Sequence, residues 1–156
     1  MKDHVLEVEL WLLRPLTEVF AFFADARNLD AITPPWLHFR TLTPAPLEMR
    51  VGTFIDYKLR LHGLPVGWRT EITEWEPPHR FVDRQIRGPY RQWIHTHTFE
   101  EKDGGTLVRD RVQYSVPGGW LEPLIHRLFV ARNVAEIFRY RQMRIKEMLQ
   151  ISNCPL

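Results

Sequence analysis

The sequence predicts a single α+β domain, residues 1–156, in which a curved antiparallel sheet wraps around a long C-terminal helix. Three observations carry this prediction. A chain of 156 residues suits one domain with one core. Between residues 53 and 116, apolar and polar side chains alternate in segments separated by short turns containing glycine or proline. From Trp120 to about Gln150, apolar residues recur at helical spacing instead.

The N-terminal part predicts a strand followed by two short helices. Val5–Leu12 alternates as a half-buried strand does. Pro15 suits the first turn of a helix, where its missing N–H is not needed. Short helical pieces extend to Thr33, and the two prolines of TPPW end them. The apolar face of the first helix consists of Leu16, Val19, Phe20, Phe22 and Phe23.

Six extended segments follow, and we expect them to pair in order as antiparallel hairpins. KDGG, between the last two segments, is a strong hairpin turn. The C-terminal helix must bury its apolar stripe, and the concave face of the sheet is the only large apolar surface available. The segments cover residues 36–43, 53–62, 66–75, 81–87, 90–101 and 106–116. The stripe consists of Leu121, Leu124, Ile125, Leu128, Ala135, Phe138, Ile145 and Leu149.

Composition and charge exclude several classes of protein. The net charge is only +2, and no nucleic-acid-binding motif is present. No apolar run is long enough to span a bilayer, and the alternating N-terminus does not read as a signal peptide. A single cysteine, Cys154, forms no intramolecular disulfide, so the cytoplasm is the expected location. One basic cluster, predicted as a solvated helix face, contains Arg139, Arg141, Arg144 and Lys146.

The stretch QWIHTHTFEE, residues 92–101, carries two histidines separated by one residue. Alternation places His95 and His97 on one face with Trp93 and Phe99, and the aromatic neighbours mark that face as buried. KDGG is expected to close the hairpin with Glu101 opposite Thr106. The inner-face pairs are then Phe99 with Val108, His97 with Asp110, His95 with Val112 and Trp93 with Tyr114. Opposite residues lie close enough for His97 and Asp110 to form a hydrogen bond.

The preceding strand adds Asp83 and Gln85 to the same face if Phe81 points inward. A three-residue loop at GPY puts Asp83 opposite either Trp93 or His95. Buried polar groups of this kind must pair with each other, with water or with a ligand. The predicted ligand pocket comprises Tyr57, Trp68, Asp83, Gln85, Trp93, His95, His97, Asp110, Tyr114 and Phe138.

Two longer stretches, FVDRQIRGPYRQWIHTHTFE and GGTLVRDRVQYSVPGG, contain the phrases F-x-D-x-Q, G-P-Y, W-x-H-x-H-x-F and D-x-V-x-Y-x-x-P-G. In combination with the element order, they resemble a small bacterial subgroup of the START-like, helix-grip superfamily. This superfamily, also called SRPBCC, includes polyketide cyclases, lipid-transfer domains and plant pollen-allergen proteins. The resemblance implies a hydrophobic cavity between sheet and helix that holds a lipid-like or polycyclic ligand. It does not fix an activity, because one fold supports many functions.

The polar cluster has three interpretations. Two histidines at i and i+2 lie about 6.6 Å apart and can converge on a metal ion with Asp83 or Asp110. Zinc sites usually have three or four ligands and no other histidine is expected on this face, so neither a metal nor a cofactor is predicted. A His97–Asp110 pair, with Asp83, suits acid–base catalysis, although no G-x-S-x-G nucleophile motif is present. The favoured interpretation is that these groups satisfy one another and orient a ligand.

The predicted function is therefore the binding or carriage of a small lipid-like, polyketide-like or quinone-like molecule. One alternative is a cyclase or dehydratase that uses His97 and Asp110 as catalytic residues. A second alternative is an interaction module whose cavity is filled by its own side chains, which a cavity below roughly 300 Å³ would favour. The sequence is compatible with a homodimer and does not determine the oligomeric state.

Overall fold

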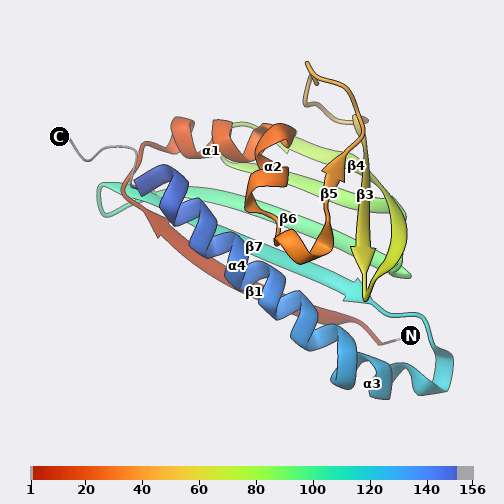
Figure 1. Cartoon of the computed structure of the whole chain (residues 1–156). Coiled ribbons are helices and arrows are strands. Elements are labelled where there is room, and N and C mark those ends of the chain that lie inside the picture. The colour runs from red at the N-terminus through yellow and green to blue at the C-terminus, as the bar shows by residue number, and fades with distance from the viewer. Residues whose placement is uncertain (1, 151–156) are drawn as a thin grey trace.

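The computed structural model describes residues 2–150 as one curved sheet, two short helices and a C-terminal helical segment (Figure 1). The seven antiparallel strands are arranged in the order β1-β7-β6-β5-β4-β3-β2, which agrees with the predicted α+β helix-grip architecture. Cys154 lies outside the described residues. The strands are β1 (His4–Leu12), β2 (Arg40–Thr41), β3 (Phe54–Leu61), β4 (Leu64–Glu76), β5 (Arg80–Arg87), β6 (Gln92–Lys102) and β7 (Gly105–Ser115). The helices are α1 (Leu16–Ala24), α2 (Ala26–Ile32), α3 (Glu122–Ile125) and α4 (Ala131–Gln150).

The hairpin between β6 and β7 has the register that the KDGG turn predicts. Glu101 pairs with Thr106, and His97 therefore lies opposite Asp110. On the other side of β6, Asp83 of β5 lies opposite His95, which resolves the choice that the sequence left open. Because β1 pairs with β7, the three strands that carry the polar residues lie inside the sheet and not at its edge.

The segment at residues 36–43 is not the continuous extended segment that the sequence predicted. Only Arg40–Thr41 pairs with β3, and Pro35–Leu37 forms a short 3-10 helix, η1. The φ angle of proline is already close to helical, which favours a turn at this position. His38 ends the turn in the left-handed region with φ 45°. The chain thus turns over the space between the sheet and α4 before it enters β2.

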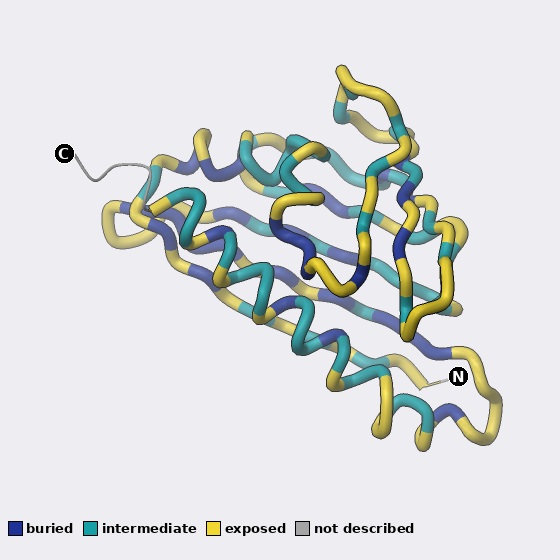
Figure 2. The backbone as a smooth tube through the Cα atoms, in the orientation of Figure 1, coloured by how far each residue is buried: buried dark blue, intermediate teal, exposed yellow. Residues whose placement is uncertain are grey.

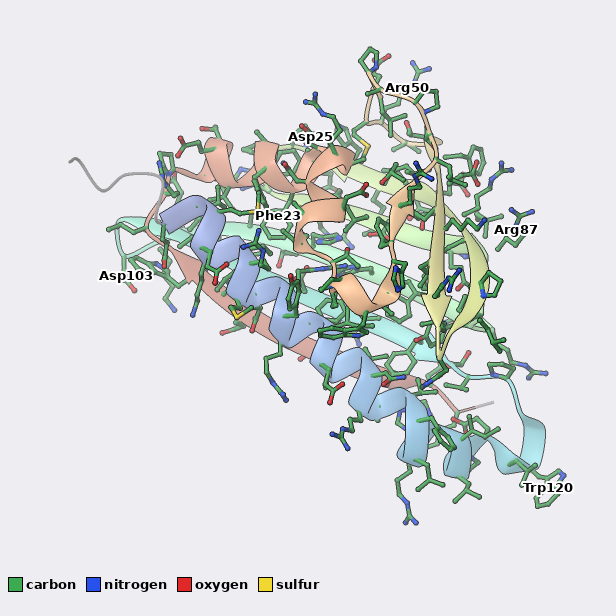
Figure 3. All side chains as sticks on the ribbon, viewed as in Figure 1. Phe23, Asp25, Arg50, Arg87, Asp103 and Trp120 are labelled. Carbon is green, nitrogen blue, oxygen red and sulfur yellow. The ribbon has the colours of Figure 1, made fainter. Side chains whose placement is uncertain are left out.

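The helix predicted from Trp120 to Gln150 is helical throughout but not uniform. A 3-10 turn η2 (Gly119–Leu121), α3 and a π-helical turn η3 (His126–Val130) precede the 20-residue α4. Only α4 runs across the concave face of the sheet, whereas α3 lies beyond the ends of the strands (Figure 1). The first part of the predicted buried stripe is consequently exposed, including Leu121 (40 %), Leu124 (49 %) and Leu128 (53 %). Trp120, labelled in Figure 3, projects from this end of the molecule.

The core lies between the inner face of the sheet and the inner side of α4 (Figure 2). One cluster of buried residues joins Phe20, Phe81, Phe99 and Ile145, and a second surrounds Phe138. A third cluster, made by Ile55, Tyr57 and Ile72, lines the side of the sheet near β3 and β4. Among residues 2–150, no helix is long and apolar enough to cross a membrane.

Candidate functional site

A cavity of about 170 Å³ lies between the concave sheet, α2 and α4. Its wall is mostly apolar and aromatic, and the polar side chains of Asp83, His95 and His97 lie together on the sheet side. Phe23, labelled in Figure 3, reaches into the interior from α1. Seven of the predicted pocket residues line this cavity: Tyr57, Trp68, Asp83, Trp93, His95, His97 and Phe138.

Three predicted pocket residues lie outside the cavity lining, each for a local reason. The side-chain amide of Gln85 donates to the backbone carbonyl of Tyr90 over 2.7 Å, so it braces the turn between β5 and β6. Tyr114 directs its hydroxyl to Nε2 of His126, 2.9 Å away, at the start of the C-terminal segment. Asp110 is buried behind the two histidines and contacts the cavity only through them.

The volume of the cavity limits the size of a ligand. It is smaller than the roughly 300 Å³ below which an interaction module is favoured, so the volume taken alone favours that alternative and leaves no room for a polycyclic ligand. Aromatic side chains of the protein occupy much of the space. The Trp68 ring packs edge-on against Trp93, with ring centres 5.3 Å apart, and against Tyr90, with ring centres 5.7 Å apart. Engineered apolar cavities of about 150 Å³ nevertheless bind benzene. The space therefore suits a molecule with one ring or a short chain.

Two histidines and two aspartates form one contiguous polar cluster across β5, β6 and β7. The His95 and His97 rings lie 3.7 Å apart, between Asp83 on one side and Asp110 on the other. All four ring nitrogens lie within 3.7 Å of a carboxylate oxygen. The rings are also held by apolar neighbours, since His97 stacks on Phe81 at 4.1 Å and the edge of His95 meets Phe138 at 5.4 Å.

The hydrogen bonds in this cluster run diagonally, not straight across the strands. Nε2 of His95 bonds to Asp110 over 3.0 Å, and Nε2 of His97 bonds to Asp83 over 3.0 Å. Nδ1 of His97 lies 2.8 Å from Oδ1 of Asp110, but the angle does not make a hydrogen bond. The predicted contact between His97 and Asp110 is therefore present, while the hydrogen-bond partners are exchanged. Diagonal neighbours on a sheet are within reach of side chains as long as histidine.

The cluster separates the protonation states of the two histidines. Burial lowers the pKa of His97, but the close contact with the Asp110 carboxylate and the hydrogen bond to Asp83 outweigh it, so this pKa lies above its usual value. Burial and the neighbouring His97 charge lower the pKa of His95. Burial would raise the pKa of both aspartates, but their contacts with the histidines hold it below the usual value. The two shifts have opposite directions, so His97 takes up a proton more readily than His95.

Arg141 also lines the cavity, contrary to the prediction that it belongs to a solvated helix face. Its guanidinium lies over the Phe138 ring, with Cζ 4.9 Å from the ring centre. Burial lowers the pKa of Arg141, opposed by the charges of Asp110 and Asp83. Helical spacing indicates this buried position, because Arg141 stands three residues after Phe138 and four before Ile145, on the buried face of α4.

Asp83, His95 and His97 each offer a ligand atom, and these atoms lie within 4.8 Å of one another. Three such ligands suit an open zinc-type site, in which Asp110 would hold the other ring nitrogens from behind. The expectation that no metal is bound stays a prediction.

Comparison with known proteins defines the class. The family described as "Polyketide cyclase / dehydrase and lipid transport" matches residues 13–143, and the chain belongs to this family. The fold is START-like and of the type that binds hydrophobic ligands. A search of curated proteins found no significant match.

Solved structures share the fold at low sequence identity. Protein Ms6760 from Mycobacterium smegmatis is 21 % identical with a TM-score of 0.68, over 96 % of this chain and 92 % of that one. Ara h 8.0201 is 14 % identical with a TM-score of 0.66, over 97 % and 100 %. Ginseng major latex-like protein 151 from Panax ginseng is 11 % identical with a TM-score of 0.68, over 94 % and 97 %. At these identities the likeness concerns the fold alone.

Proposed function

We propose that the protein binds a small, mostly apolar molecule in the cavity between the sheet and α4. The observation that carries this proposal is the combination of an apolar, aromatic wall with a few polar groups gathered on one side. Such a combination is typical of small-molecule sites, where the apolar wall supplies affinity and the polar groups fix orientation. The volume favours a single-ring or short-chain ligand over a polycyclic one.

The same proposal extends to location and partners. A reducing compartment such as the cytoplasm agrees with a chain that has one cysteine. A nucleic-acid partner is not part of the proposal, since the net charge is only +2. Sedimentation equilibrium measures the molar mass in solution and so tests whether the chain forms a homodimer.

The first experiment is mass spectrometry of the native and denatured protein, which identifies any molecule that co-purifies. Binding is then measured with that molecule in a variant with a blocked cavity. Leu61→Trp places a large ring in the cavity wall and should abolish binding. The matched control is Leu64→Trp, in the same hairpin, because Leu64 is 69 % exposed and lies outside the lining. Circular dichroism and thermal unfolding verify that both variants fold. Equal binding by both variants would place the ligand elsewhere and refute the proposal.

A second candidate function is a dehydratase or cyclase, and two adjacent histidines whose pKa values are shifted in opposite directions favour it. In this mechanism, the proton of His97 passes through Asp83, which lines the cavity and bonds to Nε2 of His97, to a leaving hydroxyl or to a carbonyl oxygen. His95 removes a proton from the adjacent carbon, and Asp83 and Asp110 hold the two rings in place. The test is turnover of a β-hydroxy ketone that fits the cavity. His97→Gln should reduce kcat by at least about 100-fold. Turnover that survives both His97→Gln and His95→Gln would eliminate this mechanism.

A further inference from the structure

Arg141 is a charged side chain in the cavity wall that forms no hydrogen bond and no ion pair among residues 2–150. Its Nε atom is buried without a hydrogen-bond acceptor. Its guanidinium contacts the face of the Phe138 ring. A buried donor without an acceptor is costly, because it loses water and gains no hydrogen bond in return.

The nearby carboxylates do not remove this cost. Asp83 and Asp110 influence Arg141 through their charges, but each already bonds to a histidine of the cluster. No carboxylate oxygen of Asp83 or Asp110 lies within 4.0 Å of a guanidinium nitrogen of Arg141. The donors of the guanidinium are therefore left for a group that enters the cavity.

We propose that the cavity binds a small apolar carboxylic acid and that Arg141 pairs with its carboxylate. This inference rests on the proposed function and names the chemical class of its ligand. The planar guanidinium presents two parallel N–H donors, which match the two oxygens of a carboxylate. A hydroxyl or a single carbonyl oxygen satisfies fewer of these donors.

The aromatic part of the cavity wall defines the rest of the ligand. Trp68, Tyr90 and Trp93 form an aromatic surface, and aromatic rings pack favourably against such surfaces at an angle or with an offset. A cavity of about 170 Å³ accommodates one ring and a short chain. An arylalkanoic acid with a single ring meets both requirements.

The experiment compares three probes of similar size: hydrocinnamate, benzylacetone and phenylpropanol. They share the phenyl ring and differ in the polar end, which is a carboxylate, a ketone and an alcohol. Dissociation constants come from isothermal titration calorimetry, and the fluorescence of Trp68 and Trp93 in the cavity wall provides a second readout. We expect hydrocinnamate to bind at least about 10-fold more tightly than phenylpropanol, because charge-assisted hydrogen bonds are the stronger ones.

The variants separate recognition by Arg141 from a general loss of binding. Arg141→Met keeps the length and apolar character of the side chain, and should weaken hydrocinnamate about 10- to 100-fold while changing phenylpropanol less than about 3-fold. Arg139→Met is the matched control, because Arg139 lies on the exposed side of the same helix. It should change none of the three constants.

Each outcome decides one point. If hydrocinnamate and phenylpropanol bind wild-type protein equally, or if Arg141→Met weakens all three probes alike, the carboxylate assignment is wrong. If benzylacetone binds as tightly as the acid, the site recognises an acceptor oxygen and not a carboxylate, which also overturns it. The proposed function fails separately, if no probe binds and no molecule co-purifies with the protein.

Discussion

Asp110→Asn tests whether the buried histidine–aspartate cluster is held together by charge. The substitution keeps the shape of the side chain and still offers an oxygen to Nε2 of His95, so it removes mainly one negative charge. In the wild-type protein, the charges of Asp83 and Asp110 offset those of His97 and Arg141. The variant leaves two buried cations beside one anion.

The magnitude follows from the burial and the remaining contacts. Removing one partner of a buried ion pair typically costs 3–5 kcal/mol. We expect the lower end, about 3 kcal/mol at pH 6, because His97 keeps its 3.0 Å hydrogen bond to Asp83. The penalty should be smaller at pH 9 than at pH 6, because the charge of His97 that Asp110 stabilises is lost as pH rises through the raised pKa.

Guanidinium chloride unfolding at both pH values, followed by circular dichroism, measures the free energy of unfolding. Asp56→Asn is the matched control, because Asp56 forms a 2.8 Å ion pair with Arg69 at the surface. Surface pairs contribute about 0–1 kcal/mol, so this variant should stay within that range at either pH. A loss below 1 kcal/mol for Asp110→Asn at pH 6, or a larger loss at pH 9 than at pH 6, would refute the charge argument.

Three further predictions concern the whole molecule. The stability of the wild-type protein should peak near neutral pH. The contribution of His97, whose pKa is raised, is complete below its usual value of 6.5 and is lost as pH rises through the raised pKa. The contribution of His95 to stability is present above pH 6.5, and it is lost as pH falls through the lowered pKa of this residue. His97→Gln should flatten the alkaline side in unfolding titrations, and an unchanged alkaline side would contradict the assignment. Ile145→Ala, at a core position with 1 % exposure, should lower the free energy of unfolding by about 3 kcal/mol. Met143→Ala, at 48 % exposure, should lower it by less than about 0.5 kcal/mol. Similar losses in both variants would mean that α4 packs differently. Elemental analysis should find substoichiometric metal, and a chelator should leave the melting temperature unchanged; one equivalent of zinc or iron that is lost in His95→Gln would show that the cluster is a metal site.

The sequence predicted the sheet well where local turn chemistry determines the pairing. KDGG set the register of β6 and β7, and every inner-face pair that follows from it is present. The loop at GPY was harder, because its length left Asp83 opposite either Trp93 or His95. The extended segment predicted at residues 36–43 was wrong in its first part, where Pro35 begins a short 3-10 helix.

The helical segment shows a different limit. Helical spacing identified the segment but not where the sheet beneath it ends, so Leu121, Leu124 and Leu128 were assigned to a buried stripe that the strands do not reach. Arg141 was missed because its residue type outweighed its position on the same face as Phe138. The volume of the cavity was beyond prediction for another reason. It depends on how rings from separate strands, such as Trp68 and Trp93, pack against each other.

The diagonal hydrogen bonds bear on both candidate functions. Direct register predicted a His97–Asp110 pair, with Asp83 nearby, and in the structure the two tilted rings lie between both aspartates and share their charge. A proton added to one ring lowers the pKa of the other, so the four residues titrate as one unit. Since Asp83 and Asp110 each bond to one histidine and lie near the other, removal of either charge should disturb both rings. Any proton transfer in the cavity therefore depends on the whole cluster, and Asp83→Asn should impair it about as severely as Asp110→Asn.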